Sequence, residues 1–512
     1  MSELVLYDKP VKKEIEMNIW MAFPAPYSYG MASLGYLSVF KFFDLQPNFF
    51  VERIFTDTTE TKLHVNDVDL IGFSLSFETD FLAFFKIFEK FNIPFNAKDR
   101  DEKWPLLFAG GPVATGNPEP FSDFFDFFTL GDGEEVCVEV AEIIKKNKHL
   151  SKKDLLIELS KVSGVYVPAL TEFNINTNQV TIDGKSFEIK RRVAELDAPL
   201  TTPILTEKNF FSNTFIIEVS RGCPFGCKFC MASFLNKPYR CASYEKIIEA
   251  IDLGLQHTNK IAFLGALISA HPRFDDICEY VYNKVQNGED IELSVSSLRA
   301  NCISEIAIKT LVACGQKHAT IAIEAGSERL RKHINKNLTE DELFAFIDVA
   351  LTNGLKGIKF YSIVGLPDEN EDDIKELVEL MLKIKNKYKS ADFSLTVSTF
   401  VPKANTPFQL EKRESSKILE KRINVLKKNL LSKGIQVRPA SVNWDDIQAL
   451  FSRGDRRLGE YAVEVFKNGA NLGAFKQVYK KMYKENRLPP FEYFANETKN
   501  FQEHQPWDFI KV

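Results

Sequence analysis

The sequence predicts an α/β protein with three parts: a parallel-sheet domain, a partial parallel barrel and a mainly helical C-terminal region. Short apolar strands alternate with amphipathic helices along most of the chain, a pattern typical of parallel sheets. The 512 residues are enough for about three domains of the usual ~100–200 residues each. The composition, 45% hydrophobic and 26% charged, is ordinary for a globular protein and excludes a disordered or fibrous one.

The N-terminal part, residues 1–150, contains four strand signals. They are apolar runs at residues 17–23, 69–74, 106–111 and 125–130. An apolar helical period covers residues 79–91, and a further helix is expected to end near Lys146. Alternating units of this length place the carboxyl ends of the strands at one sheet edge, where a ligand can bind.

A bridging segment with β character, residues 151–205, leads into a second α/β series at residues 206–410. Its strand signals lie at residues 214–219, 260–264, 291–296, 319–323, 357–363 and 394–400. Helical periods separate them at residues 244–255, 273–287, 304–314, 340–353 and 371–387. This alternation predicts a partial parallel barrel.

The C-terminal region, residues 411–512, is predicted to be mainly helical and is basic. It contains 20 Lys/Arg and 13 Asp/Glu, whereas the whole chain has a net charge of −5. Residues 421–438 include six basic residues and no acidic one, and Arg453-Gly454-Asp455-Arg456-Arg457 adds a compact basic segment. A basic face of this kind suits the phosphates of RNA, but a solvated helix face is the simpler interpretation.

The sequence contains no membrane span or signal peptide that we can identify. Charged residues interrupt the longest apolar stretches, and no basic start followed by an apolar run opens the chain. Eight cysteines in a chain of this length do not form a disulfide framework, which favours a reducing compartment. We therefore expect a cytoplasmic protein.

The most specific motif is a cysteine triplet that directly follows an apolar strand. Cys223, Cys227 and Cys230 have the spacing Cys-x3-Cys-x2-Cys, and the glycines and proline between them permit a tight loop. Three thiolates on one loop suit a [4Fe–4S] cluster, in which the fourth iron stays open to a small molecule. The alternatives are packing cysteines, or a zinc site with Cys241 as fourth ligand. The remaining cysteines are expected to be core thiols, at positions Cys137, Cys241, Cys278, Cys302 and Cys314.

This triplet, with the aromatic Phe229 before its last cysteine, resembles the signature of radical S-adenosylmethionine (SAM) enzymes. The resemblance implies a partial (β/α)6 barrel in which the open iron binds the methionyl amine and carboxylate of SAM. It further implies reductive cleavage of SAM to a 5′-deoxyadenosyl radical that abstracts hydrogen from a substrate. An external electron donor of flavodoxin or ferredoxin type would supply the electron.

The same resemblance implies SAM contacts at the ends of the barrel strands. It gives a backbone contact to Gly265, hydroxyl contacts to Ser294 and Ser296, and an adenine contact to Val364. Glu324 would accept from the ribose hydroxyls, and Lys336 would pair with the methionyl carboxylate. The acidic residue that the family usually has beside Gly265 is absent, and Glu324 and Lys336 are ordinary surface charges in the competing interpretation. The residue that acts on the substrate is not identified.

The N-terminal part resembles the Rossmann-like cobalamin-binding domain that precedes the barrel in one large radical SAM subgroup. Residues 71–74, 109–112 and 130–135 carry this resemblance. It makes cobalamin a candidate cofactor, with Gly110 and Gly111 allowing close approach of the corrin tail. The Asp-x-His-x-x-Gly element that supplies an axial histidine is missing, although some members of the subgroup bind cobalamin without one. The alternative role for the two glycines is a tight strand-to-loop turn.

The hypothesis favoured by these patterns is a radical SAM enzyme that methylates an unactivated carbon with cobalamin as methyl carrier. One alternative is a cobalamin-independent radical reaction, either a rearrangement or a modification of RNA or protein. Methylthiolation belongs to this alternative, because residues 397–409 resemble the barrel end of tRNA methylthiotransferases, but the cysteines for their second cluster are absent. Another alternative is a degenerate scaffold that binds RNA or the ribosome, which the intact triplet disfavours. The whole chain most resembles an uncharacterised bacterial radical SAM group, so its substrate stays unknown, with RNA or protein bound through the basic C-terminal region as candidates.

Overall fold

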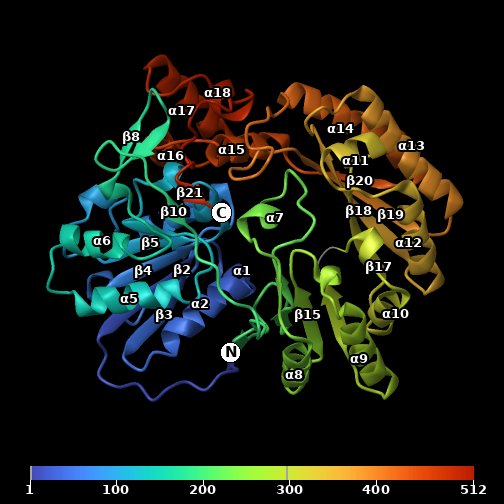
Figure 1. The fold of residues 1–512 in the computed structure, drawn as a ribbon, viewed down its shortest axis with the longest axis horizontal. Coiled ribbons are helices and arrows are strands. Elements are labelled where there is room, and N and C mark those ends of the chain that lie inside the picture. Colours follow the sequence, from blue (N-terminus) through green and yellow to red (C-terminus); the bar gives the residue numbers. More distant parts are fainter. Residues whose placement is uncertain (1–2, 296–297) are drawn as a thin grey trace.

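The computed structural model describes residues 3–295 and 298–512, and it confirms the predicted α/β fold class. The N-terminal sheet lies beside the barrel in Figure 1, with helix α7 (Met231–Leu235) between them. Helices of the C-terminal region lie on the N-terminal side and extend toward the barrel (Figure 1).

The N-terminal sheet has six strands in the order β3-β2-β4-β5-β6-β7. These strands are β2 (Met17–Phe23), β3 (Phe49–Phe55), β4 (Leu70–Ser74), β5 (Leu106–Gly110), β6 (Phe127–Thr129) and β7 (Val165–Tyr166). All pairs are parallel except β6 with β7. The four predicted strands are confirmed, whereas β3 was not predicted, because Glu52 and Arg53 interrupt its apolar run.

Helices cover both faces of this sheet. They are α1 (Tyr27–Gly30), α2 (Leu34–Asp44), α3 (Phe81–Lys90), α4 (Pro112–Gly116), α5 (Val136–Lys146) and α6 (Lys152–Ser160). Helix α3 confirms the predicted helix at residues 79–91. Its residues Phe81, Phe84, Phe85 and Phe88 are fully buried on one face. Burial of each such side chain contributes about 1.5–3 kcal/mol, so α3 is a main anchor of the core.

Short strands lie in the bridging segment and at the two ends of the chain. They are β1 (Leu4–Val5), β8 (Glu172–Asn174), β9 (Gln179–Thr181), β10 (Ile189–Lys190), β11 (Ile204–Leu205) and β21 (Ile510–Lys511). Strand β1 pairs with β11, β8 pairs with β9 within the segment, and β10 pairs in parallel with β21 at the C-terminal end.

Two parallel sheets form the barrel wall. The first has the order β12-β15-β16 and the second the order β17-β18-β19-β20. Their strands are β12 (Phe215–Glu218), β15 (Lys260–Leu264), β16 (Glu292–Val295), β17 (His318–Glu324), β18 (Gly357–Val364), β19 (Asp392–Thr399) and β20 (Gln436–Pro439). The sheets approach each other at a bridge between Leu298 and Ile321. The six predicted strands are confirmed, and β20 is an addition from the region predicted to be helical.

The barrel helices are α8 (Tyr244–Leu255), α9 (Phe274–Gln286), α10 (Glu305–Ala313), α11 (Glu328–His333), α12 (Glu340–Thr352), α13 (Glu371–Lys387) and α14 (Ser416–Leu430). A two-stranded pair, β13 (Ser220–Arg221) with β14 (Arg240–Cys241), encloses the cysteine triplet. The apolar core of the barrel lies between its strands and these helices.

The C-terminal helices are α15 (Val442–Ser452), α16 (Arg457–Lys467), α17 (Leu472–Lys484) and α18 (Phe491–Ala495). They pack on the N-terminal domain, where the Phe451 and Phe475 rings contact the Phe81 ring at centroid distances of 4.6 and 6.0 Å. The C-terminal region and the N-terminal domain therefore share one core.

The interpretation of Arg453–Arg457 as a basic surface segment is wrong. Arg453 is buried and donates to three main-chain oxygens, those of Phe494, Glu411 and Glu497 at 2.8–3.0 Å. Arg456 donates through Nε to the carboxylate of Glu119 in the N-terminal domain at 2.7 Å. Arg456 therefore joins the C-terminal region to the N-terminal domain, and Arg453 joins segments within the C-terminal region, because burial of either cation without a partner would be costly.

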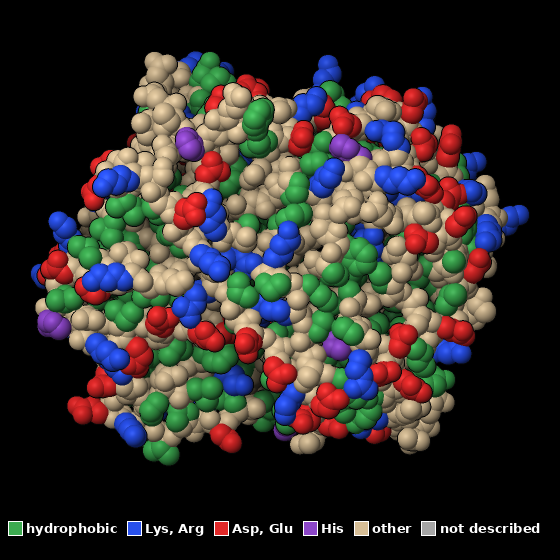
Figure 2. Space-filling view, viewed as in Figure 1, with side chains coloured by type: hydrophobic (Ala, Val, Ile, Leu, Met, Phe, Trp, Pro, Cys, Tyr) green, Lys and Arg blue, Asp and Glu red, His purple; other side chains and the backbone are tan. Residues whose placement is uncertain are grey.

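Not all six basic residues at 421–438 lie on the surface. Arg422 is buried and pairs with Glu369 at 2.8 Å, while Lys421 and Lys428 are exposed on α14. On the face drawn in Figure 2, Lys and Arg side chains are interspersed with Asp and Glu. Among the described residues, no helix is long and apolar enough to cross a bilayer.

Replacement of Arg456 with methionine is expected to destabilise the protein strongly. The change leaves the fully buried Glu119 carboxylate without its cation, which typically costs about 3–5 kcal/mol. Arg487→Met is the matched control, because the Arg487 ion pairs are more exposed and such pairs contribute about 0–1 kcal/mol. Thermal unfolding measures both effects, and equal shifts of the two midpoints would contradict this account of the interface.

Candidate active site

The cysteine triplet lies on a loop between β13 and α7, at the barrel side of the domain interface. Gly222 and Gly226 have φ values of +80° and +65°, which glycine adopts without strain. Cys227 is buried, and Cys223 and Cys230 are partly exposed. All three are free thiols, as cluster ligation needs. Among the described residues, however, no set of three or more Cys, His, Asp or Glu converges as a metal-binding group, so ligation by this triplet stays a prediction.

The segment after α11 fixes this loop. Asn335 adopts a φ of +59° and donates through Nδ2 to the main-chain oxygens of Phe225 and Gly226 at 2.9 and 3.0 Å. The thiol of Cys227 lies 3.7 Å from the main-chain oxygen of Asn335. The Arg299 guanidinium covers the Phe225 ring at 4.0 Å. The loop is therefore held by polar contacts to residues more than 70 positions along the chain.

Glu324 and Lys336 form a buried ion pair beside this loop. Lys336 Nζ donates to Glu324 Oε1 at 2.9 Å, and each side chain is only 9% exposed. Glu324 ends β17 with a φ of +63°, where the register between β17 and β18 shifts. A non-glycine residue in this conformation is strained, and such strain is concentrated at functional sites. The electrostatic field of Lys336 also reaches Cys227: burial raises the pKa of the Cys227 thiol, and Lys336 offsets part of the rise.

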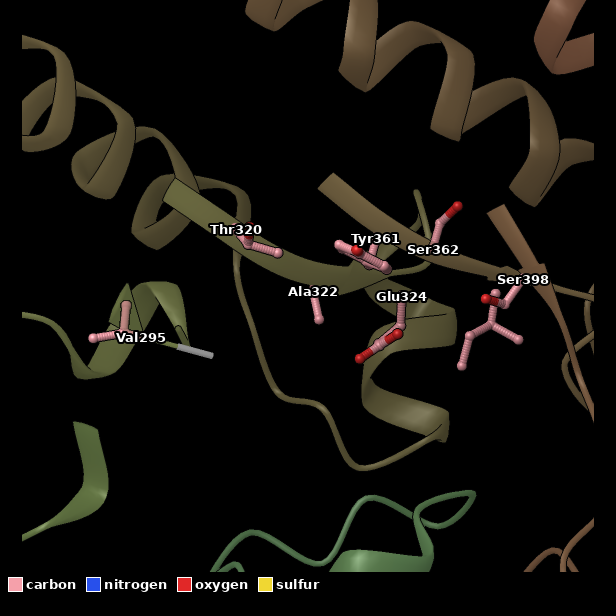
Figure 3. Close-up of a pocket in the computed structure, with 8 residues that line it drawn as sticks. Val295, Thr320, Ala322, Glu324, Tyr361, Ser362 and Ser398 are labelled. Carbon is pink, nitrogen blue, oxygen red and sulfur yellow. The ribbon is translucent and has the colours of Figure 1, made fainter. Parts of the chain in front are cut away.

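A cavity of about 570 Å³ opens in front of Glu324. Val295, Thr320, Ala322, Tyr361, Ser362, Ile363 and Ser398 also line it, as Figure 3 shows for most of them. Successive side chains of a strand point to opposite faces, so β17 buries Ile321 and Ile323 under the helices and turns Thr320, Ala322 and Glu324 to the cavity. The volume lies within the usual range for small-molecule sites.

The other SAM contacts expected from the sequence are spread around this region. Phe229 packs on the apolar cluster of Ala325 and Leu330. Ser294 is exposed on β16, next to Val295 of the cavity wall. A Cβ on Gly265 would lie 2.5 Å from Ser220 Oγ, so this position requires glycine. The Val364 side chain is buried in the barrel core, which leaves only its main chain for a ligand. Ser296 lies outside the described residues.

Several residues at the site were not predicted. Arg299 and Asn335 fix the cysteine loop, and Thr320, Tyr361 and Ser398 line the cavity. The alternation of Tyr361 with the buried Phe360 is a signal that could have placed it on the inner face of the barrel. The expectation of core thiols is confirmed for Cys137, Cys278 and Cys314, but Cys241 and Cys302 are partly exposed.

Gly110 and Gly111 lie away from the cavity, at the carboxyl edge of the N-terminal sheet. Gly111 has a φ of +101°, and a Cβ there would lie 2.6 Å from the main-chain oxygen of Leu75. A Cβ on Gly110 would meet Thr129 Oγ1 at 2.6 Å. Gly111 therefore requires glycine for the turn, and a side chain at Gly110 would displace the Thr129 hydroxyl. Beyond them, a space of about 10 Å³ lies between α4, α7 and α15.

Two family models match the chain and together cover more than half of it. They are "Radical SAM proteins, N-terminal" over residues 36–168 and "Radical SAM superfamily" over residues 217–381. An uncharacterized protein of Methanocaldococcus jannaschii is 28% identical over 412 residues, which cover 80% of this chain and 82% of that protein. An uncharacterized methyltransferase of Pyrococcus horikoshii is 24% identical, over 63% of this chain and 66% of that protein.

Two solved structures share the fold. The radical SAM methyltransferase TsrM of Kitasatospora setae, with tryptophan and a SAM analog bound, has a TM-score of 0.53 at 12% identity, covering 77% of this chain and 75% of TsrM. The cobalamin-dependent SAM radical enzyme OxsB, with aqua-cobalamin and SAM bound, has a TM-score of 0.52 at 14% identity, covering 92% of this chain and 71% of OxsB. The matched models, the barrel and its N-terminal parallel sheet agree with one another, and the chain belongs to the radical SAM superfamily of enzymes.

Proposed function

We propose that this enzyme reductively cleaves SAM to methionine and a 5′-deoxyadenosyl radical, which then takes a hydrogen atom from a polar substrate in the barrel. Cys223, Cys227 and Cys230 would hold the [4Fe–4S] cluster. Three free thiols on one loop fit this group, because three ligands leave one of four irons open. When bound, such a cluster supplies the electron that cleaves the sulfonium bond and an iron for the methionyl group.

The buried pair of Glu324 and Lys336 is the observation that carries this proposal. Glu324 lines the cavity of about 570 Å³, and Lys336, which donates to Glu324, lies close enough to the cysteine loop to offset part of the rise in the pKa of the Cys227 thiol. SAM carries a carboxylate, an ammonium group and ribose hydroxyls. The Lys336 ammonium and the Glu324 carboxylate can recognise such groups by charge-assisted hydrogen bonds. Lys336 would orient the methionyl carboxylate, and Glu324 would accept from the ribose. Their mutual contact fixes both before SAM arrives.

The side chains that line the cavity favour a polar substrate. Thr320, Tyr361 and Ser398 bring hydroxyl groups to the cavity, and Ala322 leaves room between them. These hydroxyls can donate to and accept from a bound molecule, which orients the carbon that loses hydrogen. We further propose that an external electron-transfer protein of flavodoxin or ferredoxin type reduces the cluster. The buried Arg453–Arg457 segment gives no support to RNA binding at that position.

The finer hypothesis, methylation of an unactivated carbon with cobalamin, has mixed support. The fold likeness to TsrM and OxsB and the similarity to the Pyrococcus horikoshii methyltransferase favour it. The internal contacts of Gly110, Gly111 and the acidic loop oppose it, because Thr129, Leu75 and Arg221 occupy these positions. The geometry therefore supports best the cobalamin-independent form of the radical reaction.

Anaerobic reconstitution with iron and sulfide, followed by an assay for 5′-deoxyadenosine, tests the proposed function. The reduced wild-type enzyme is expected to release 5′-deoxyadenosine and methionine in equal amounts, and the reaction is expected to stop when the reductant is omitted. Absence of 5′-deoxyadenosine from a preparation whose absorbance and iron content indicate a complete cluster would refute SAM cleavage.

A further inference from the structure

The carboxyl edge of the N-terminal sheet is the place where an α/β domain normally binds a ligand. In this chain the edge consists of three stretches, the loop after β4, helix α4 after β5, and the loop at Gly131–Glu135 after β6. Each stretch contacts another part of the same chain. These contacts join the N-terminal domain to the cysteine loop, the end of the barrel and the C-terminal region.

The first contact joins α4 to the helix that directly follows the cysteine triplet. Gly116 lies so close to α7 that a Cβ there would be 3.3 Å from Met231 Cε and 3.7 Å from Leu235 Cδ1. Met231 is the residue after Cys230. Helix α4 therefore supports the end of the cysteine loop.

The second contact joins the acidic loop after β6 to the residue two positions before the triplet. Arg221 pairs with Asp132 at 3.1 Å and with Glu134 at 2.6 Å, and also with Glu218 of β12 at 2.7 Å. The Arg221 side chain is 12% exposed, so these pairs are shielded from water. Arg240, which pairs with Arg221 across β13 and β14, reaches the same Asp132 at 2.7 Å. The start of the cysteine loop is therefore fixed by acidic residues of the N-terminal domain.

The remaining part of the edge is covered from the barrel end and the C-terminal region. Asn405 donates through Nδ2 to the main-chain oxygen of Gly116 at 2.9 Å, and Lys403 pairs with the buried Glu78. Asn117 donates through Nδ2 to the main-chain oxygen of Gly454 at 2.8 Å. Between Gly116, Met231 and Phe451, these contacts leave a space of about 10 Å³, which has room for about one water molecule at most.

We propose that the N-terminal domain braces the cysteine loop at both ends and that the braced edge holds no cobalamin. The acidic loop fixes Arg221 before the triplet, and α4 fixes α7 after it. Arg221 is thus a positioning residue for the cluster ligands, and the domain that resembles a cofactor carrier orients the loop instead. The expected effect of the brace on SAM cleavage rests on the proposed function, whereas the corrinoid and cluster measurements test the brace without it.

Replacement of Arg221 with methionine tests the brace. We expect SAM cleavage to fall by about 10- to 100-fold, the usual effect of losing a residue that orients a metal ligand, while reconstituted iron is retained. The electron paramagnetic resonance spectrum of the reduced cluster is expected to change even without SAM. Arg192→Met is the matched control, because Arg192 pairs with the neighbouring Glu135 and Glu139 but lies outside the cysteine loop.

Glu134→Gln provides a milder test if Arg221→Met does not fold. It removes one of the acidic partners of Arg221 and keeps the shape of the side chain. A spectrum and a cleavage rate equal to those of the Arg192→Met control would overturn the brace. If the wild type cleaves no SAM, the cluster spectrum of each variant still decides for or against it.

Equilibrium dialysis with hydroxocobalamin tests the second half of the proposal, with OxsB treated identically as the positive control. We expect no saturable corrinoid binding to the anaerobic wild-type protein and no corrinoid absorbance after expression with added cobalamin. Saturable binding of one corrinoid per chain would overturn it, whatever the result of the SAM assay.

Discussion

Replacement of Cys227 with alanine is expected to abolish the formation of 5′-deoxyadenosine and to prevent assembly of a complete [4Fe–4S] cluster. Cys227 is the buried member of the triplet, and its loop is fixed by Asn335 and Arg299. Loss of a residue that only supports a ligand costs about 10- to 100-fold, so loss of a ligand should reduce the rate by more than about 100-fold. Iron content, cluster absorbance and 5′-deoxyadenosine yield measure the effect.

Cys137→Ala is the matched control for this prediction. Cys137 is a buried free thiol on α5 of the N-terminal domain, outside the triplet. Its removal is expected to leave cluster content and cleavage unchanged. SAM cleavage by Cys227→Ala at the rate of Cys137→Ala would refute the assignment of the triplet as the cluster ligands.

Single and double replacements of Glu324 and Lys336 are expected to distinguish the effect of this pair on stability from its effect on SAM binding. Lys336→Met leaves a buried carboxylate without its cation, which typically lowers stability by about 3–5 kcal/mol. The cavity beside Glu324 admits water, so the lower end of this range is the better expectation for the pair. The double variant Glu324→Gln with Lys336→Met removes both charges and should regain most of the stability.

SAM affinity should not recover in the same double variant. A lost hydrogen bond to a charged group weakens binding by about 1.5–3 kcal/mol, so we expect roughly a 10- to 100-fold rise in the dissociation constant. Thermal unfolding and equilibrium dialysis with SAM measure the two effects. Lys332→Met, which removes an exposed lysine of the same stretch, should change neither. Wild-type affinity in the double variant would exclude this pair from SAM recognition.

The internal contacts of the N-terminal domain bear on its resemblance to cobalamin-binding domains. The Gly110-Gly111 turn and the acidic loop after β6 are the features that resemble a cobalamin-binding domain. Their contacts in this chain are internal: the glycines pack against Leu75 and Thr129, and the acidic residues pair with Arg221. In the proposed brace, these residues orient the cysteine loop.

Local patterns predicted much of the fold. Strand β4 is an apolar run that ends at Ser74, β18 is followed by Gly365, and α13 begins at a capping asparagine followed by three acidic residues. These signals lie within short windows of sequence and depend on periodicity and capping, which is why they can be read without the tertiary structure. β3 and β20 were missed because charged residues interrupt them and only pairing with neighbouring strands stabilises them.

The sequence by itself determined the radical SAM family, the order of the two α/β parts and the three cysteines that carry the proposed chemistry, because spacing on a single loop is a local property. Only the tertiary structure decided that Glu324 pairs with Lys336, that Arg456 is buried against Glu119, and that Asn117 donates to the main chain of Gly454. The last two depend on residues more than 300 positions apart, whose contact is set by how the domains pack and not by any pattern within either segment.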